Sequence, residues 1–464
     1  MFLKKIDIEN FRLFDKNFIV DNFNIPDNTK EGSGLTLIVG ENGCGKTSLL
    51  DAISMCMLDY KASSFNIYDM NSTKKETNII FSSNEEFKVD GSMPNSSFIA
   101  TGFRFKANLR SIKSKSYLQS PIVFDQYYIN KNPNKPKPNS PDLRLSVNNP
   151  FSGKRYNDTD ILFLDKNRIF QIKSGSFNNT RFDRLMGDFN SQYVKAMKKE
   201  NMPDLNEDLN QKIKIGKIEN IFLENAVSEF EKISSKKIWL DFINNYEPFS
   251  KASFIMKGNE NIQIPLSSIG AGYEMIFSLI YSYYLAKQND KKIIILIDEP
   301  ELHLHPDIQK KFVDFLLKIS IESQIILSSH SPILVKQLLY NDNIKTVVIN
   351  NDKTISEIDD FKLPYLSANE INYLAFGLAT EEYHNELYEE LNYLFYQNEI
   401  HIKDFDAKFF ITDKNEQKTS PWKGKPNEVS IHTFIRNQIH HRKDNGIPDY
   451  NELKKSIEFM RNCF

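Results

Sequence analysis

The chain has 464 residues and balances 59 Lys and Arg against 61 Asp and Glu, which gives a formal net charge of −2. This balance excludes a protein that binds polyanions through bulk positive potential, so any nucleic-acid contact must come from a local site. Cys44, Cys56 and Cys463 are too few and too scattered for a disulfide framework or a thiolate zinc site, which favours a reducing cytoplasm. The sequence has neither a signal-peptide core nor an apolar run of about 18 residues, so we expect a soluble protein without a membrane span.

The N-terminal part of the chain has the pattern of a β-rich fold. Residues 2–8 and 35–39 are predicted strands, and the second leads into GENGCGKT and then into the helical pattern SLLDAISMCML. From about residue 60 to 180, the apolar runs NIIF, SFIATGFRF and DILFL alternate with turn-rich tracts. They predict an antiparallel β layer, with one mobile loop in the proline-rich tract at 131–142.

The rest of the chain changes from mixed charge to alternating helices and strands. Residues 182–248 have helical spacing without sustained apolar heptads, so we expect a short helical insertion over 182–260 and not a long coiled coil. After residue 262 a polar turn precedes the helix MIFSLIYSYYLA, the strand KIIILI, the helix DIQKKFVDFLLKI and the strand QIILSS, an order typical of a parallel α/β sheet. Candidate helices at the end of the chain lie around 368–378, 382–398, 428–440 and 450–462.

The stretch from Gly40 to Thr47 fits the pattern G-x-x-x-x-G-K-[ST] in full and lies between a predicted strand and a predicted helix. Its glycines let backbone N–H groups turn toward a phosphate, while Lys46 can reach the β- and γ-phosphates and Thr47 can ligate Mg²⁺. The residues expected to bind the nucleotide here are Gly40, Asn42, Gly43, Gly45, Lys46, Thr47 and Ser48.

An acidic element lies 252 residues after Lys46, where an apolar strand ends in Asp298 and Glu299. Asp298 can hold the magnesium water shell, and Glu299 can polarise the attacking water as the catalytic base. An acidic pair after a strand can also be a helix N-cap. Its combination with the phosphate loop favours the functional interpretation.

Two further segments complete the predicted site. The segment 266–274 places small residues at a helix start, suited to hold the γ-phosphate of a nucleotide bound to another subunit, and its candidates are Ser267, Ser268, Gly270 and Gly272. His330 follows the strand QIIL, where its imidazole could contact the γ-phosphate. A serine-rich helix cap and a strand-end histidine are also common structural features, and the order of the segments carries the functional interpretation.

In this order the motifs resemble Walker A, a diverged signature, Walker B, the segment PELHLHP at 300–306 and the switch histidine of ABC/SMC-type AAA ATPases of the overcoming-lysogenization-defect (OLD) class. The resemblance implies an α/β ABC-type ATPase head with a parallel sheet, an antiparallel β layer, a short helical insertion and a mostly helical C-terminal region. The expected domains are an N-lobe at 1–181, the insertion at 182–260, a C-lobe at 261–350 and the helical region at 365–464. An element at 163–168 also resembles this class, with Arg168 near the site, whereas neither Gln119 nor Gln126 is a good match for a Q-loop glutamine.

The resemblance also implies partners. ATP and Mg²⁺ are the expected cofactors, and two ATP molecules would be sandwiched in a head-to-tail homodimer or a higher homo-oligomer. Glu357, Asp359 and Asp360 have the pattern of turn residues, so we do not expect a built-in Toprim nuclease. The resemblance then narrows to ATPase subunits of antiphage systems such as Septu, including retron-linked ones, or PARIS, in which a separately encoded nuclease is the effector.

The C-terminal region offers a second hypothesis. The segments 370–377 and 432–441 resemble defence ATPases, and Arg436, Asn437 and His441 match the R-x4-H pattern of HEPN ribonucleases. An arginine can stabilise a pentavalent phosphorane while a histidine moves a proton at the ribose 2′-oxygen. The same helix could instead pack its apolar residues inward.

Three functions therefore stay open: an ATPase that controls a partner nuclease in antiphage defence, a self-contained ATP-gated HEPN-like ribonuclease, and a DNA-repair ATPase. Contact with nucleic acid is compatible with each. The genes beside this one would separate them, because only the first function requires a neighbouring nuclease.

Overall fold

The computed structural model describes most of the chain, and its contacts divide into two compact units. Unit 1 comprises residues 1–38, 43–329 and 337–355, and unit 2 comprises residues 39–42, 330–336 and 356–464. The described residues are 1–58, 61–62, 64–90, 97–109, 122–131, 142–144, 159–164, 172–174, 177–179, 221–242, 252–257, 263–265, 271–288, 291–396 and 400–464.

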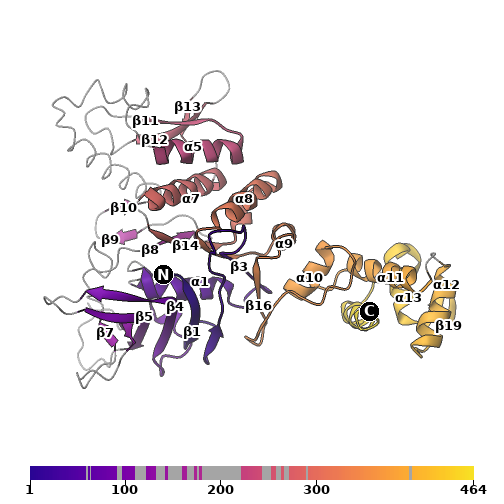
Figure 1. The fold of residues 1–464 in the computed structure, drawn as a ribbon. Coiled ribbons are helices and arrows are strands. Elements are labelled where there is room, and N and C mark those ends of the chain that lie inside the picture. The colour runs from indigo at the N-terminus through magenta and orange to yellow at the C-terminus, as the bar shows by residue number, and fades with distance from the viewer. Residues whose placement is uncertain are drawn as a thin grey trace, which may run out of the picture. The chain divides into compact units, whose positions relative to one another are not determined.

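The first sheet of unit 1 has the strand order β17-β16-β3-β15-β14-β8 (Figure 1). The pairs β3–β15, β15–β14 and β14–β8 are parallel. Every residue of β3 and β15 is buried, as expected for central strands covered on both faces. The strands are β3 (Leu35–Val39), β8 (Thr159–Leu164), β14 (Lys292–Asp298), β15 (Gln324–Ser328), β16 (Lys345–Ile349) and β17 (Ile355–Ser356).

The second sheet of unit 1 is antiparallel, with the order β2-β1-β4-β5-β6-β7, and confirms the predicted β layer. One assignment to this layer is wrong. The run DILFL forms β8, which pairs in parallel with β14 in the other sheet. The strands of the layer are β1 (Leu3–Glu9), β2 (Phe18–Val20), β4 (Thr77–Asp90), β5 (Ser97–Leu109), β6 (Ile122–Asn130) and β7 (Asp142–Arg144).

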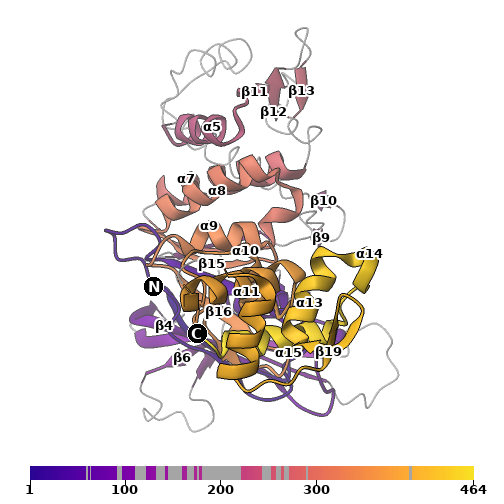
Figure 2. The same cartoon turned by 90° about the vertical axis from the view of Figure 1, so that its right-hand side faces the viewer.

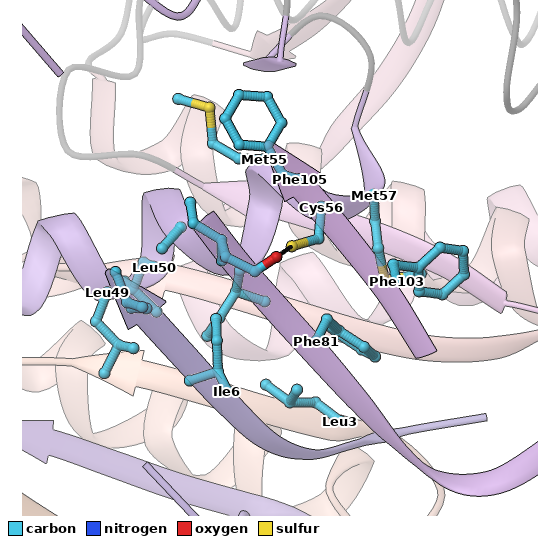
Figure 3. Close-up of a cluster of buried hydrophobic side chains, with 14 of the residues drawn as sticks. Leu3, Ile6, Leu49, Leu50, Met55, Cys56, Met57, Phe81, Phe103 and Phe105 are labelled. Atoms are coloured by element: carbon cyan, nitrogen blue, oxygen red, sulfur yellow. Dashed lines mark hydrogen bonds between the residues drawn. The ribbon is translucent and has the colours of Figure 1, made fainter. Parts of the chain in front are cut away.

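Helix α1 (Lys46–Met57) lies in the hydrophobic core of unit 1 and is buried on nearly all sides. Its core cluster draws side chains from both sheets, including Phe81 and Phe105 from the antiparallel sheet and Ile326 from the parallel one. Figure 3 shows Leu49, Leu50 and Met55–Met57 of α1 in this cluster, with the Cys56 thiol 3.6 Å from the carbonyl oxygen of Ile79. Because α1 follows the phosphate loop directly, this core fixes the position of the loop.

Helices α5, α7 and α8 of unit 1 pack against one another through aromatic residues. Phe230 of α5 meets Phe277 of α7 edge-on, with ring centroids 5.5 Å apart, and α7 and α8 meet through Tyr283 and Phe315. The ribbons of these helices can be followed in Figures 1 and 2. The predicted helical insertion holds α5 but also the antiparallel strands β11 and β12, which the sequence pattern did not indicate. These elements are α5 (Ile221–Ser234), β11 (Ile238–Phe242), β12 (Ala252–Lys257), β13 (Gln263–Pro265), α7 (Ala271–Gln288) and α8 (Pro306–Ile319), with the short pair β9 (Ile172–Ser174) and β10 (Phe177–Asn179). Helix α9 (Pro332–Leu339) begins in unit 2 and ends in unit 1.

Unit 2 is mainly helical, and its four longest helices match the predicted ones. Helices α11, α13 and α15 pack together around a core that includes Tyr388, Phe410 and Ile435 (Figure 2). The hairpin β18–β19 and a π-helix at Asp406–Asp413 were not expected. The elements are α10 (Ala368–Phe376), α11 (Glu381–Tyr396), α12 (Ile402–Phe405), β18 (Ser420–Trp422), β19 (Lys425–Val429), α13 (Ile431–His440), α14 (Arg442–Asn445) and α15 (Tyr450–Arg461).

No helix in the described part of the chain combines the length and the apolar character needed to cross a membrane.

Candidate nucleotide site

The site begins at the carboxyl edge of the parallel sheet. The strand register places Asp298 beside Ser328, and Ser328 beside Ile38, so β3, β14 and β15 end side by side. Two backbone hydrogen bonds of 3.1 Å extend this ladder, from Glu299 N–H to the Ser328 carbonyl and from Ser329 N–H to the Ile38 carbonyl. The carboxyl edge of an α/β sheet is where such folds place ligands.

The loop after β3 requires its glycines. Gly40, Gly43 and Gly45 have φ angles of 145°, 77° and 120°, which side chains other than hydrogen disfavour. Gly45 has a second constraint, because a Cβ added there would lie 2.7 Å from the ring of Phe14. The loop thus combines a left-handed backbone with a close packing contact, and α1 begins directly after it.

Lys46 begins α1 and is only 4% exposed. Burial lowers its pKa, while the neighbouring Cys44, Glu299 and Asp298 act to raise it. The Lys46 ammonium donates to the Cys44 sulfur at 3.6 Å. A buried cation close to the loop is well placed to bind phosphate oxygens, which would replace the hydration it lacks.

Asp298 connects the phosphate loop with the strand edge. Thr47 Oγ1 donates to one Asp298 oxygen at 2.9 Å, and Ser328 Oγ donates to the other at 2.5 Å. Asp298 is 1% exposed. The donor set consists of hydroxyl and carboxylate oxygens, the ligand type that Mg²⁺ prefers, so these residues fit a magnesium site.

Glu299 follows Asp298 in a left-handed conformation, with φ 48° and ψ 61°. It stands at the N-cap of the 3-10 helix Pro300–His303, but its side chain makes no capping hydrogen bond there. Its N–H is held by Ser328, through the carbonyl oxygen at 3.1 Å and Oγ at 3.3 Å. The capping role that the sequence left open is therefore not what fixes this side chain.

The switch segment after β15 also has defined contacts. Ser329 is fully buried and donates to Glu301 at 3.0 Å. Within unit 2, the His330 ring stacks on Phe376 at the end of α10, with centroids 6.2 Å apart and an angle of 25° between the rings. The next residue, Gly377, has φ 66° and lies against Glu41 of the phosphate loop.

Several predicted residues lie outside the described part of the chain. They are Ser267, Ser268 and Gly270 of the signature, Arg168 and Gln119. Gly272 is described and is buried in the first turn of α7. Gln126 is buried and donates to the Met55 carbonyl at 2.7 Å, which anchors α1 and gives it a structural role.

The R-x4-H residues lie on and after α13. Arg436 is half-buried, Asn437 is buried, and His441 is exposed just beyond the helix, where its N–H donates to the Asn437 carbonyl at 2.8 Å. Ile435 packs into the core of unit 2 and His440 is exposed. This arrangement agrees with the packing alternative, and the nuclease role of the motif stays a prediction.

Sequence reasoning assigned no role to Ser328 or to Phe14. Ser328 shares Asp298 with Thr47, and Phe14 packs against Gly45. A serine at the end of a predicted strand beside Asp298 is a weak signal for the first. Nothing local in the sequence indicates that Phe14 reaches the phosphate loop.

Comparison with known proteins gives several matches. Endonuclease GajA of Bacillus cereus (strain HuB5-5) is 24% identical over 78% of this chain and 63% of its own length. The OLD nuclease of Thermus scotoductus is 24% identical over 71% of this chain and 59% of its own length. Septu protein PtuA of Bacillus mycoides is 24% identical over 85% of this chain and 46% of its own length. The chain thus spans less than two thirds of the length of these relatives. Among solved structures, an Smc head bound to the C-winged helix domain of ScpA aligns at 17% identity over 77% of this chain and 98% of its own, with a TM-score of 0.48.

The OLD and Septu relatives belong to the classes that the sequence resembles, so the resemblance is confirmed. A family model described as "AAA domain, putative AbiEii toxin, Type IV TA system" matches residues 35–336, more than half of the chain. This range begins at β3 and includes the phosphate loop, Asp298, Glu299 and His330. The chain therefore belongs to this family of AAA domains.

Proposed function

We propose that this protein binds ATP with Mg²⁺ and hydrolyses it. The observation that carries the proposal is the hydrogen-bonded set Thr47–Asp298–Ser328, which joins the phosphate loop to the acidic strand end. Thr47 and Asp298 would hold Mg²⁺, which when bound neutralises charge on the phosphates. Lys46 would bind the β- and γ-phosphate oxygens. Glu299 would accept the proton of the attacking water, and His330 would contact the γ-phosphate.

The ATPase would act as a homodimer or a larger oligomer. Ser267, Ser268, Gly270 and Gly272 of one subunit would meet the nucleotide bound by the phosphate loop of the other. A single chain would then hold only half of each site, so hydrolysis should depend on protein concentration. The support for this proposal is the order of the motifs and the family of the chain.

The biological role that these features favour is a sensor or scaffold in antiphage defence that controls a separately encoded nuclease in the cytoplasm. Support comes from the similarity to Septu protein PtuA, which extends over 85% of this chain. GajA and the OLD relative are themselves named nucleases, and the match covers 63% and 59% of their own lengths.

Calorimetric titration with Mg–ATP tests the central proposal. The variant Lys46→Ala should lose measurable binding, because backbone N–H groups alone cannot replace a buried ammonium on the phosphates. Lys16→Ala is the matched control, since Lys16 is exposed on the turn before β2. Equal ATP affinity in the parent and in Lys46→Ala would overturn the assignment of this site.

A further inference from the structure

The turn between β16 and β17 is held in one conformation by its own polar groups. Asn350 N–H donates to the Thr354 carbonyl and Lys353 N–H donates to the Asn350 carbonyl, both at 3.0 Å. Thr354 donates from its N–H and its hydroxyl to Asp352, at 2.9 and 2.7 Å. Within this turn Lys353 adopts φ 67°. The turn is therefore a defined support for the Lys353 side chain.

From this turn, Lys353 reaches the phosphate loop. Its ammonium donates to the carbonyl oxygen of Cys44 at 2.9 Å and to that of Gly43 at 3.5 Å. The turn and these loop residues belong to the same compact unit. Lys353 is half-buried, so its charge is partly shielded from water.

The direction of these carbonyls determines where the loop presents its donors. In a trans peptide unit the carbonyl and the N–H point in opposite directions within one plane. The carbonyl of Gly43 shares its peptide unit with Cys44 N–H, and the carbonyl of Cys44 shares its unit with Gly45 N–H. Because the Lys353 ammonium binds both carbonyls, the N–H groups of Cys44 and Gly45 point to the opposite side of the loop. A hydrogen bond to a carbonyl also polarises its peptide unit and strengthens the N–H as a donor.

We propose that Lys353 is a positioning residue for the nucleotide. It acts from behind the loop, by fixing the peptide units of Gly43 and Cys44 so that the N–H groups of Cys44 and Gly45 are oriented for a phosphate before the nucleotide arrives. The proposal rests on the proposed function, because it assigns these N–H groups to the phosphates of ATP. Unlike Lys46, Lys353 contacts the loop backbone and not the ligand.

The test compares two substitutions at this position. Lys353→Met keeps the length of the side chain but removes the ammonium, and should weaken both Mg–ATP and Mg–ADP binding by about 10-fold, since ADP carries the same β-phosphate. Lys353→Arg keeps the charge and the donors and should recover most of the affinity. Calorimetry gives the dissociation constants, and thermal melting without nucleotide shows whether each variant is folded.

Lys345→Met is the matched control. Lys345 lies on β16 and also donates to a backbone carbonyl, that of Asp21 at 3.2 Å, but away from the phosphate loop. It should lower the melting temperature about as much as Lys353→Met does and leave nucleotide affinity at the parent value. A general structural effect would lower the nucleotide affinity of both variants, whereas a positioning role lowers that of Lys353→Met alone.

The outcomes separate this inference from the proposed function. A parent protein that binds no ATP would refute the proposed function and the role of Lys353 with it. A parent that binds ATP, together with a Lys353→Met variant of equal affinity, would refute only the role of Lys353. Equal losses in the Met and Arg variants would also refute it, because the ammonium contact would then not be what matters. If Lys353→Met does not fold, Lys353→Gln takes its place with the same expectation.

Discussion

Glu299 has a backbone conformation that residues other than glycine rarely adopt, and this conformation immediately follows the buried Asp298. A left-handed residue of this kind costs of order 1 kcal/mol and persists where the surroundings fix it, often at functional sites. Here Ser328 fixes it by receiving the Glu299 N–H with both its carbonyl and its hydroxyl oxygen. The sharp change of direction separates the two adjacent carboxylates: Asp298 accepts from Thr47, whereas the Glu299 side chain does not cap the helix that follows.

From this separation we predict that Glu299→Gln preserves ATP binding and abolishes most turnover. The amide keeps the size and backbone of the residue but cannot accept a proton, so kcat should fall by about 10² or more. The variant should also accumulate as an ATP-bound dimer, visible by size-exclusion chromatography. Glu382→Gln, at an exposed position of α11, provides the control and should retain the parent rate. Parent-like turnover in Glu299→Gln would mean that another residue is the base.

Elements that depend on local sequence are the ones that the sequence predicts well. The strand at 35–39 and the helices around 368–378 and 450–462 are observed within two residues of their predicted ends. DILFL was placed in the wrong sheet because a six-residue apolar strand has the same pattern in a parallel and an antiparallel setting. The hairpin β18–β19 was missed because most of its residues are not buried and its apolar alternation is weak.

The same distinction holds for the candidate site. Lys46 and Thr47 lie in a contiguous motif, so the sequence alone locates them. Ser328 lies beside Asp298 because of the register of β14 and β15. Lys353 reaches the phosphate loop from the turn between β16 and β17. No local sequence pattern encodes either contact. Residues of this second kind become visible only when the sheet is assembled.

At the scale of one helix end, Gly377 combines a C-cap with a contact to the phosphate loop. Its N–H closes α10 by donating to the Tyr373 carbonyl at 3.1 Å, with φ 66°. A Cβ added here would lie 2.3 Å from the Glu41 carboxylate. We therefore predict that Gly377→Ala destabilises the protein by about 1 kcal/mol through the left-handed backbone and also displaces Glu41, which should weaken ATP binding.

Gly424 offers the matched control for that prediction. Its φ is 77°, but a Cβ added there would meet nothing within 4 Å. Gly424→Ala should therefore lose a similar amount of stability in urea unfolding while ATP affinity measured by calorimetry stays at the parent value. If Gly377→Ala also keeps that affinity, the contact with Glu41 has no role in nucleotide binding.

At the scale of the whole molecule, unit 2 combines the helical C-terminal region with residues 39–42, at the start of the phosphate loop, and residues 330–336, which include His330. Phe376 and Gly377 contact these two segments directly. We therefore expect nucleotide binding to alter the stability of unit 2.

Two buried histidines should make that stability depend on pH. His384 and His432 share the Ser456 hydroxyl, at 2.9 and 2.7 Å, and His432 stacks on Phe459. Burial lowers the pKa of His384 to about 3 and that of His432 to about 4. Both are neutral in the folded state while the unfolded chain takes up protons near pH 6.5, so the stability present above pH 6.5 should be lost progressively as pH falls toward 4.

Chemical unfolding followed by tyrosine fluorescence, repeated from pH 7.5 to 4.5, measures this loss. In His432→Gln the dependence should be shallower, because one of the two proton-binding sites of the unfolded chain is gone. His401→Gln is the control, since His401 is exposed at the N-cap of α12. A slope that is unchanged in His432→Gln would contradict the burial argument.

Whether the effector lies inside this chain is decided by one substitution on folded, ATPase-competent protein. With a separately encoded nuclease as effector, purified RNA should stay intact with the parent and with His441→Ala, because no chemistry depends on this exposed imidazole. With a HEPN-like site, the parent should cleave RNA in EDTA and His441→Ala should lose most of it, since general acid–base catalysis contributes roughly 10² to 10⁴-fold. His440→Ala distinguishes the two adjacent rings, since both are exposed but only His441 has the R-x4-H spacing from Arg436. We expect no cleavage by any of the three proteins; metal-free cleavage lost in His441→Ala and kept in His440→Ala would place the nuclease in unit 2.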